Sequence, residues 1–89
     1  MLFRSNQANI VEQLRNIGVT VQPLHTIGSG CPDLVLGWKG RNYLVEIKDG
    51  NKPSSARKLT IDEQWWHQGW RGQVAVCDNI DQILKLINA

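Results

Sequence analysis

Two short runs of alternating apolar residues, joined through Lys39 and Gly40, constrain the fold of this 89-residue chain most strongly. The runs read DLVLGW at 33–38 and NYLVEIK at 42–48. Such alternation predicts strands, and a glycine in the second turn position favours a tight hairpin between them. The centre of the chain is therefore predicted to be an antiparallel hairpin.

The register of this hairpin brings two acids together. If Lys39 and Gly40 alone form the loop, Trp38 pairs with Arg41, and counting back places Asp33 opposite Glu46. Directly opposed residues have Cβ atoms about 4.5–5.5 Å apart, and two carboxylates so close repel unless a proton or a cation lies between them. A loop one residue longer would shift the pairing, whereas a four-residue loop would restore it.

A lysine lies on the same side of the second strand as one of these acids. Side chains alternate across a strand, so Lys48 shares a face with Glu46. A hard ion such as Mg²⁺ suits two carboxylates with a backbone carbonyl and retained water. It could polarise a phosphodiester oxygen while Lys48 stabilises the developing charge. The alternative is a surface ladder of ion pairs, but the joint placement of the three residues favours hydrolysis of nucleic acid.

The flanking sequence completes an α/β pattern around a mixed sheet. A helix is expected from Ser5, which can cap it, to Gly18, which can end it. Its sheet-facing stripe is predicted to contain Gln7, Ile10, Val11, Leu14 and Ile17. Residues 19–26 then favour a strand that Pro23 restricts to a sheet edge.

The second half of the chain adds two helices and one strand. Thr60 to Glu63 form a capping box that opens a helix ending near Trp70. Residues 73–77 (QVAVC) favour a buried strand parallel to 42–48, because a crossover through a helix is usually right-handed. Asn79 caps a last helix, whose apolar stripe holds Ile80, Ile83, Leu84 and Ile87. The predicted order is α-β-β-β-α-β-α, in one domain over residues 1–89.

The charge distribution adds a possible contact surface. The net charge is only +2, but residues 39–58 hold six lysines and arginines against Glu46 and Asp49. These cations could hold backbone phosphates beside the acid pair, or they could belong to a solvated loop.

Several classes of protein are disfavoured. Cys31 and Cys77 have no neighbour at zinc-ligand spacing, and a pair of lone cysteines without a signal-like start predicts a reduced, intracellular protein. No apolar run approaches the roughly 18–20 residues of a membrane span, so we expect no membrane partner. The glycines of 28–30 (GSG) are not followed by a P-loop lysine, so no nucleotide cofactor is expected.

The combined pattern GSGCPDL, YLVEIKDGNK and LTIDEQ resembles the stand-alone virus-type replication-repair nuclease (VRR-NUC) domain of the PD-(D/E)XK superfamily. The resemblance implies a restriction-endonuclease-like αβββαβ core with a C-terminal helix, dependence on Mg²⁺ or Mn²⁺, and cleavage of branched DNA. Stand-alone members are similar to Holliday-junction resolvases and act as homodimers. Because such domains occur in phages and prophages, it also implies DNA repair or packaging in the cytoplasm of a bacterial host.

Carried over by position, the resemblance assigns site residues. Asp33 and Glu46 would be metal ligands, the Ile47 carbonyl a third ligand, and Lys48 the catalytic lysine. Gln64 would match the family glutamine on the following helix. We expect it on the sheet-facing side with Ile61, Trp65 and Gln68, or else capping a nearby backbone group.

One position departs from the family. Many relatives carry a metal-site glutamate on the first helix, where this chain has Gln7; Glu12 is the other candidate, but helical spacing places it away from the apolar stripe. An amide at this position leaves the number of metal ions open. It also permits a rival function, a branched-DNA-binding module without catalysis.

The remaining candidates are contact residues. Predicted DNA contacts are His25, Ser29, Lys52, Arg57 and Lys58. Trp66 and Trp70 lie one turn apart on the side of their helix opposite Trp65, which favours a dimer interface or packing under the last helix. A third possibility is an interaction protein that uses this aromatic face and does not bind DNA.

Overall fold

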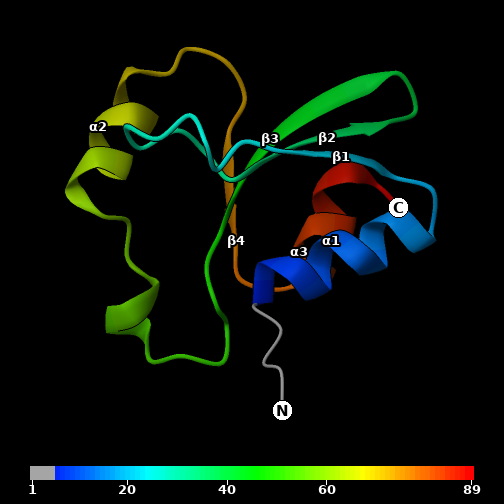
Figure 1. Cartoon of the computed structure of the whole chain (residues 1–89), viewed down its shortest axis with the longest axis horizontal. Helices are drawn as coiled ribbons and strands as arrows, with labels where there is room; N and C mark the ends of the chain where they lie inside the picture. The colour runs from blue at the N-terminus through cyan, green and yellow to red at the C-terminus, as the bar shows by residue number, and fades with distance from the viewer. Residues whose placement is uncertain (1–5) are drawn as a thin grey trace.

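The computed structural model describes residues 6–89 and has the predicted order of elements (Figure 1). The elements are α1 (Asn6–Asn16), β1 (Thr20–Pro23), β2 (Leu34–Trp38), β3 (Arg41–Ile47), η1 (Ser54–Arg57), α2 (Ile61–Gly69), β4 (Ala75–Cys77) and α3 (Ile80–Ile87). The αβββαβ core with a C-terminal helix is confirmed; the short 3₁₀ helix η1 was not predicted. Ser5, the predicted cap of α1, lies outside the described residues.

The sheet is mixed and has the strand order β1-β2-β3-β4. The first two pairings are antiparallel, and β3 pairs with β4 in parallel, as predicted. β1 lies at an edge, as its proline indicated, although it ends at Pro23 and is shorter than expected. Within residues 6–89, no helix is both long and apolar enough to cross a bilayer.

The predicted hairpin register is confirmed. Trp38 pairs with Arg41, and the two loop residues Lys39 and Gly40 both have positive φ, 50° and 79°, as a two-residue hairpin turn of this hand requires. At the other end of the hairpin the last pair is Leu34 with Val45, and Asp33 and Glu46 are the residues that directly adjoin it.

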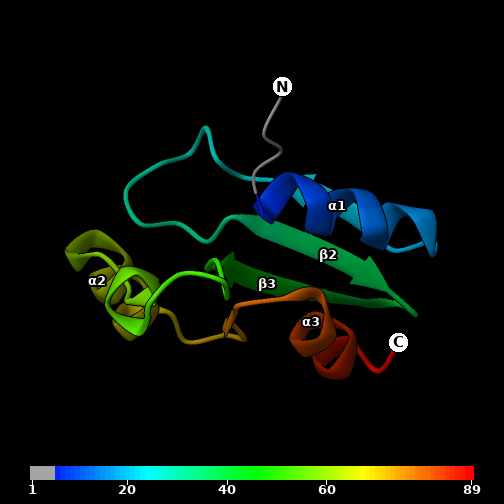
Figure 2. The same cartoon turned by 90° about the horizontal axis from the view of Figure 1, so that it is seen from below.

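One face of the sheet carries the apolar core, and α1 and α3 lie side by side on it (Figure 2). The predicted stripe of α3 is confirmed, and the stripe of α1 is confirmed at Ile10, Val11 and Leu14. Ile17 is 51 % exposed, because α1 ends at Asn16 and the chain turns away at Gly18, whose φ is 95°. The prediction that Ile17 belongs to the core is therefore wrong.

Helix α2 stands beyond the end of the sheet, opposite α1 and α3 (Figures 1 and 2). Its predicted capping box is confirmed: the Glu63 backbone N–H donates to Thr60 Oγ1 (3.2 Å), and the Thr60 N–H donates to Glu63 Oε1 (2.8 Å). These two bonds satisfy donors that the first turn of a helix would otherwise leave free.

The expected orientation of α2 is wrong. Ile61 and Trp65, predicted to pack towards the sheet, are 67 % and 70 % exposed. The side of α2 that turns inwards carries Glu63, Trp66 and His67. The reason is that the inward side of α2 meets the polar side chains Glu46 and Lys48 at the end of β3, and not the apolar face of the sheet.

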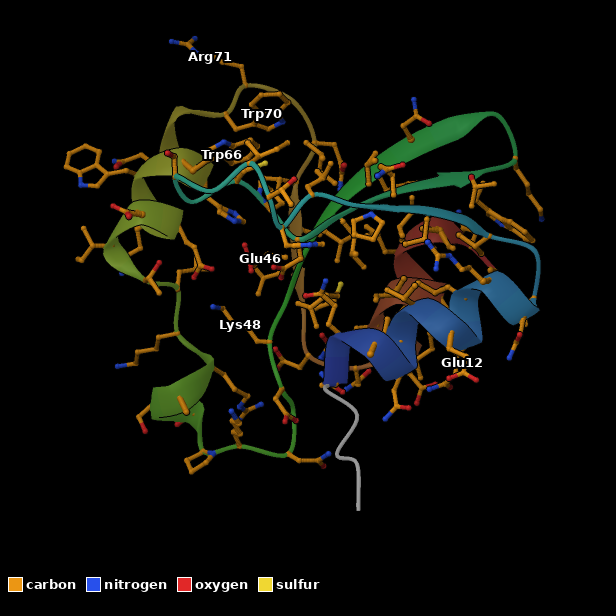
Figure 3. All side chains as sticks on the ribbon, viewed as in Figure 1. Glu12, Glu46, Lys48, Trp66, Trp70 and Arg71 are labelled. Carbon is orange, nitrogen blue, oxygen red and sulfur yellow. The ribbon has the colours of Figure 1, made fainter. Side chains whose placement is uncertain are left out.

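Trp66 of α2 and Trp70, which follows the helix directly, stack on each other. Trp66 and Trp70 have ring centroids 4.6 Å apart and an interplanar angle of 19°, and the Trp70 indole N–H donates to the Gln73 carbonyl (3.1 Å). They lie at the end of the molecule away from α3 (Figures 1 and 3), so packing under the last helix is wrong. Trp70 keeps 45 % of its surface exposed.

Candidate active site

The acid pair lies where β2 begins and β3 ends. Asp33 is fixed by its Oδ2 atom, which accepts a hydrogen bond from the Ile47 backbone N–H at 2.7 Å. Glu46 is only 2 % exposed, and its Oε1 atom is buried without a hydrogen-bond partner. Burial, together with the hydrogen bond and the charge of Asp33, raises the pKa of Glu46 to about 9. At neutral pH Glu46 therefore keeps its proton.

Lys48 and Glu46 project from the same side of β3 towards α2 (Figure 3). The Lys48 Nζ atom lies 2.7 Å from Glu63 Oε1 in a hydrogen-bonded ion pair. One turn further along α2, His67 Nε2 lies 4.0 Å from Glu46 Oε1, and it too is buried without a hydrogen-bond partner. The strand thus presents an acid and a base, and the helix opposes each with a group of the other kind.

This arrangement reflects matched spacings. Residues two apart on a strand are separated by about 6.6 Å, and residues four apart on a helix by about 6 Å along the axis. Glu63 and His67 therefore span α2 at nearly the separation at which Glu46 and Lys48 span β3. Neither Glu63 nor His67 was predicted as a site residue, although their i, i+4 spacing was a signal that they share one helix face.

Two further residues of the site neighbourhood were not anticipated. Burial and the charges of Glu46 and Asp33 raise the pKa of the Cys31 thiol, which places this side chain close to both acids. The side chain of Asn6, the first residue of α1, donates a hydrogen bond to the Lys48 carbonyl (3.1 Å), just after the end of β3. The contact ties the position of Lys48 to the helix on the opposite face of the sheet.

Gln7 and Glu12, the candidates for a first-helix site residue, lie elsewhere. Gln7 and Glu12 line a pocket between α1 and β1 together with His25. Figure 3 places Glu12 on the far side of α1 from Glu46 and Lys48. The structure therefore brings none of these three predicted residues to the acid pair.

Gln64 is also turned away from the sheet. Its side chain is exposed, and its amide donates a hydrogen bond to the Leu59 carbonyl (3.1 Å). This is the backbone-capping alternative raised from the sequence. The expectation that Gln64 faces the sheet is wrong, because the inward face of α2 is the one carrying Glu63.

The predicted DNA contacts lie in the segments that join β1 to β2 and β3 to α2. Lys52 and Lys58 are exposed on either side of η1. The Arg57 guanidinium is bound to the Asp78 carboxylate at 3.1 Å, which ties η1 to the end of β4. Ser29 is exposed in the glycine loop, where it adopts a left-handed φ of 55°.

The donor set fits a hard divalent ion. No three His, Cys, Asp or Glu side chains among residues 6–89 are placed to hold a metal ion together. Mg²⁺, however, commonly takes one or two carboxylates and keeps several waters. The orphaned Glu46 Oε1 beside Asp33 provides such a pair of oxygen ligands, and the proton that Glu46 holds is the one a cation would replace.

The buried acid predicts an unusual pH dependence of stability. Without divalent ions, the free energy of unfolding should fall as pH rises from about 5 towards 9, because the folded Glu46 keeps a proton that the unfolded residue loses above its ordinary pKa of 4.5. The contribution of one such group is at most about 1.4 kcal/mol per pH unit. Urea unfolding across this range would measure it, and Glu46→Gln should flatten the profile. A wild-type profile no steeper than that of Glu46→Gln would contradict the assignment.

Comparison with known proteins identifies the family. No protein-family model matches the chain, and no curated protein matches it either. A solved structure described as a VRR_NUC domain is 31 % identical in sequence, with a TM-score of 0.52 over 92 % of this chain and 89 % of that one. The sequence patterns that contain Asp33, Glu46 and Lys48 resemble the same family. The chain therefore belongs to the VRR-NUC family of nuclease domains and has a restriction-endonuclease-like fold.

Proposed function

We propose that this domain is a metal-dependent endonuclease that hydrolyses phosphodiester bonds in branched DNA and acts as a homodimer. The observation that carries the proposal is the buried Glu46 carboxyl, which lies beside Asp33 and two residues before Lys48. Burying two neighbouring acids costs free energy unless a proton or a cation is shared between them. A purely structural surface ladder would leave both acids in solvent.

The residues divide the chemistry among them. Asp33, Glu46 and the Ile47 carbonyl would hold Mg²⁺ or Mn²⁺, and Asp33 is oriented for this by the Ile47 N–H. The bound ion would polarise a phosphate oxygen and lower the pKa of a water molecule. The Lys48 ammonium group would donate hydrogen bonds to the attacking water or to the charge that develops on phosphorus.

Exposed cations beside the site would hold the DNA backbone. Lys52 and Lys58 have exposed side chains and are the first candidates for phosphate contacts, with Ser29 and its glycine loop alongside. Arg57 already pairs with Asp78, so its contribution would include ordering η1. Contacts to phosphate carry no sequence information, which suits an enzyme that selects DNA by shape.

The rival function is a branched-DNA-binding module of the same fold without catalysis. It is favoured by one observation, namely that Gln7 supplies neither a carboxylate nor a contact to the acid pair. In that case no metal ion would support cleavage, and Lys48→Ala would leave junction binding unchanged at a fixed salt concentration.

Substrate choice and assembly can be tested together. We expect the wild-type protein to cut a four-way junction symmetrically, and to cut flap and linear duplex DNA of the same sequence more slowly. Light scattering should give the mass of a dimer, with Trp70 as the exposed aromatic candidate for the interface. A monomer at the concentration that cuts would contradict the dimeric form of the proposal, and equal rates on all three substrates would contradict selectivity for branched DNA.

A further inference from the structure

We infer that Glu63, the third residue of α2, is a positioning residue that holds Lys48 in its working orientation; this inference rests on the nuclease function proposed above. Lys48 Nζ lies 2.7 Å from Glu63 Oε1. The two side chains are only 14 % and 17 % exposed, so the pair is largely shielded from water and salt.

The same carboxylate oxygen makes a second contact that fixes its place. Glu63 Oε1 also accepts the Thr60 backbone N–H at 2.8 Å, and the Glu63 backbone N–H returns a bond to Thr60 Oγ1. A lysine side chain has four rotatable bonds and loses much conformational freedom when it is fixed. The Thr60 N–H holds the Glu63 carboxylate in place, and this carboxylate in turn holds the Lys48 side chain. Part of the conformational entropy of Lys48 is therefore lost before DNA binds.

The charge state of Glu63 suits the role. Burial raises the pKa of this carboxyl, but the Lys48 ammonium and the Thr60 N–H outweigh burial and hold the pKa below its usual range. Glu63 is therefore a carboxylate at neutral pH. It is the carboxylate that faces the Lys48 ammonium group from α2.

The position of α2 itself is set by a close backbone contact. A Cβ atom added at Gly30 would lie 2.2 Å from the Asp62 carbonyl oxygen, so the glycine loop fits directly against the first turn of α2. The loop that leads into Asp33 and the helix that carries Glu63 are thus packed together. This contact fixes Glu63 relative to the acid pair as well as to Lys48.

Single-turnover cleavage of the four-way junction in saturating Mg²⁺ tests the inference with two variants. Glu63→Gln should lower the rate of the chemical step about tenfold or more, while the Kd for the junction changes less than about twofold. Asp62→Asn is the matched control: it makes the same acid-to-amide change at an exposed side chain in the same helix turn and should keep the cleavage rate near wild type. Unchanged or faster cleavage by Glu63→Gln, or an equal loss in Asp62→Asn, would overturn the positioning role.

A second readout does not depend on cleavage. In acetic anhydride labelling followed by mass spectrometry, Lys48 should react more slowly than the exposed Lys52 and Lys58 in the wild type, and should approach their rates in Glu63→Gln. Equal Lys48 labelling in the two proteins would overturn the inference. If labelling changes as expected but the wild type cuts no DNA, the proposed function fails and the ion pair stands.

Discussion

Asp33→Asn should lower the rate of DNA cleavage by at least about a hundredfold while leaving the fold intact. An asparagine oxygen can still accept the Ile47 N–H that now bonds Asp33 Oδ2 at 2.7 Å, so the hairpin keeps this contact. What the substitution removes is the negative charge beside Glu46. The loss should therefore appear in metal-supported cleavage and not in the unfolding midpoint.

Asp81→Asn provides the matched control for this prediction. Asp81 is an exposed aspartate in the first turn of α3, on the opposite side of the molecule from α2. The same chemical change at Asp81 should leave cleavage within about twofold of wild type, because surface substitutions away from special features have small effects. An Asp33→Asn protein that cuts as fast as Asp81→Asn would remove Asp33 from the catalytic centre.

Gly30→Ala should be among the most destabilising single substitutions in the chain. Gly30 has φ of +81°, where a side chain costs about 1–2 kcal/mol, and its new Cβ would lie 2.2 Å from the Asp62 carbonyl oxygen. Overpacking of this kind costs a further 1–3 kcal/mol or so. Urea unfolding should therefore show a loss of about 2–5 kcal/mol, and cleavage should fall because α2 is displaced from Lys48.

Gly28→Ala separates the two causes. Gly28 has a similar φ of +73°, but nothing lies within 4 Å of a Cβ added there. The substitution should lower the free energy of unfolding only by the cost of placing a side chain at positive φ, about 1–2 kcal/mol. If the two variants lose equal stability, the close approach of the glycine loop to α2 is not a constraint.

The hairpin and its acid pair were predictable from the sequence. A two-residue loop with glycine in its second position admits one register, and that register alone decides which side chains oppose each other. Asp33 and Glu46 lie close together because the turn fixes the pairing of every residue along the two strands up to their ends. The result did not depend on how distant parts of the chain pack.

The orientation of α2 was not predictable in the same way. Its sequence is apolar on two sides, and helical periodicity alone does not say which side turns inwards. Two tertiary contacts set the orientation of α2: Lys48 pairs with Glu63, and Gly30 packs against the first turn of the helix. The sequence explains Glu63 fully as a member of the capping box, so it gives no indication of the second contact, which is with Lys48.

The sequence could not show which α1 residue approaches the acid pair, because that depends on how the whole helix is placed on the sheet. The stripe of α1 correctly identified Ile10, Val11 and Leu14, and Gln7 belongs to the same side of the helix. The docking of α1 over the sheet nevertheless brings Gln7 to a pocket with His25, while Asn6 reaches the Lys48 carbonyl. A shift of one residue along a helix changes direction by about 100°, which is enough to exchange the two roles.

The most direct test of catalysis at this centre is cleavage of an end-labelled four-way junction by the purified wild-type protein and by Lys48→Ala, each with Mg²⁺, with Mn²⁺ and with EDTA. We predict cuts by the wild type with either metal, none with EDTA, and a loss of at least about a hundredfold in Lys48→Ala with junction binding preserved. Binding of the junction without cleavage under every metal condition would contradict the nuclease assignment and favour the binding module.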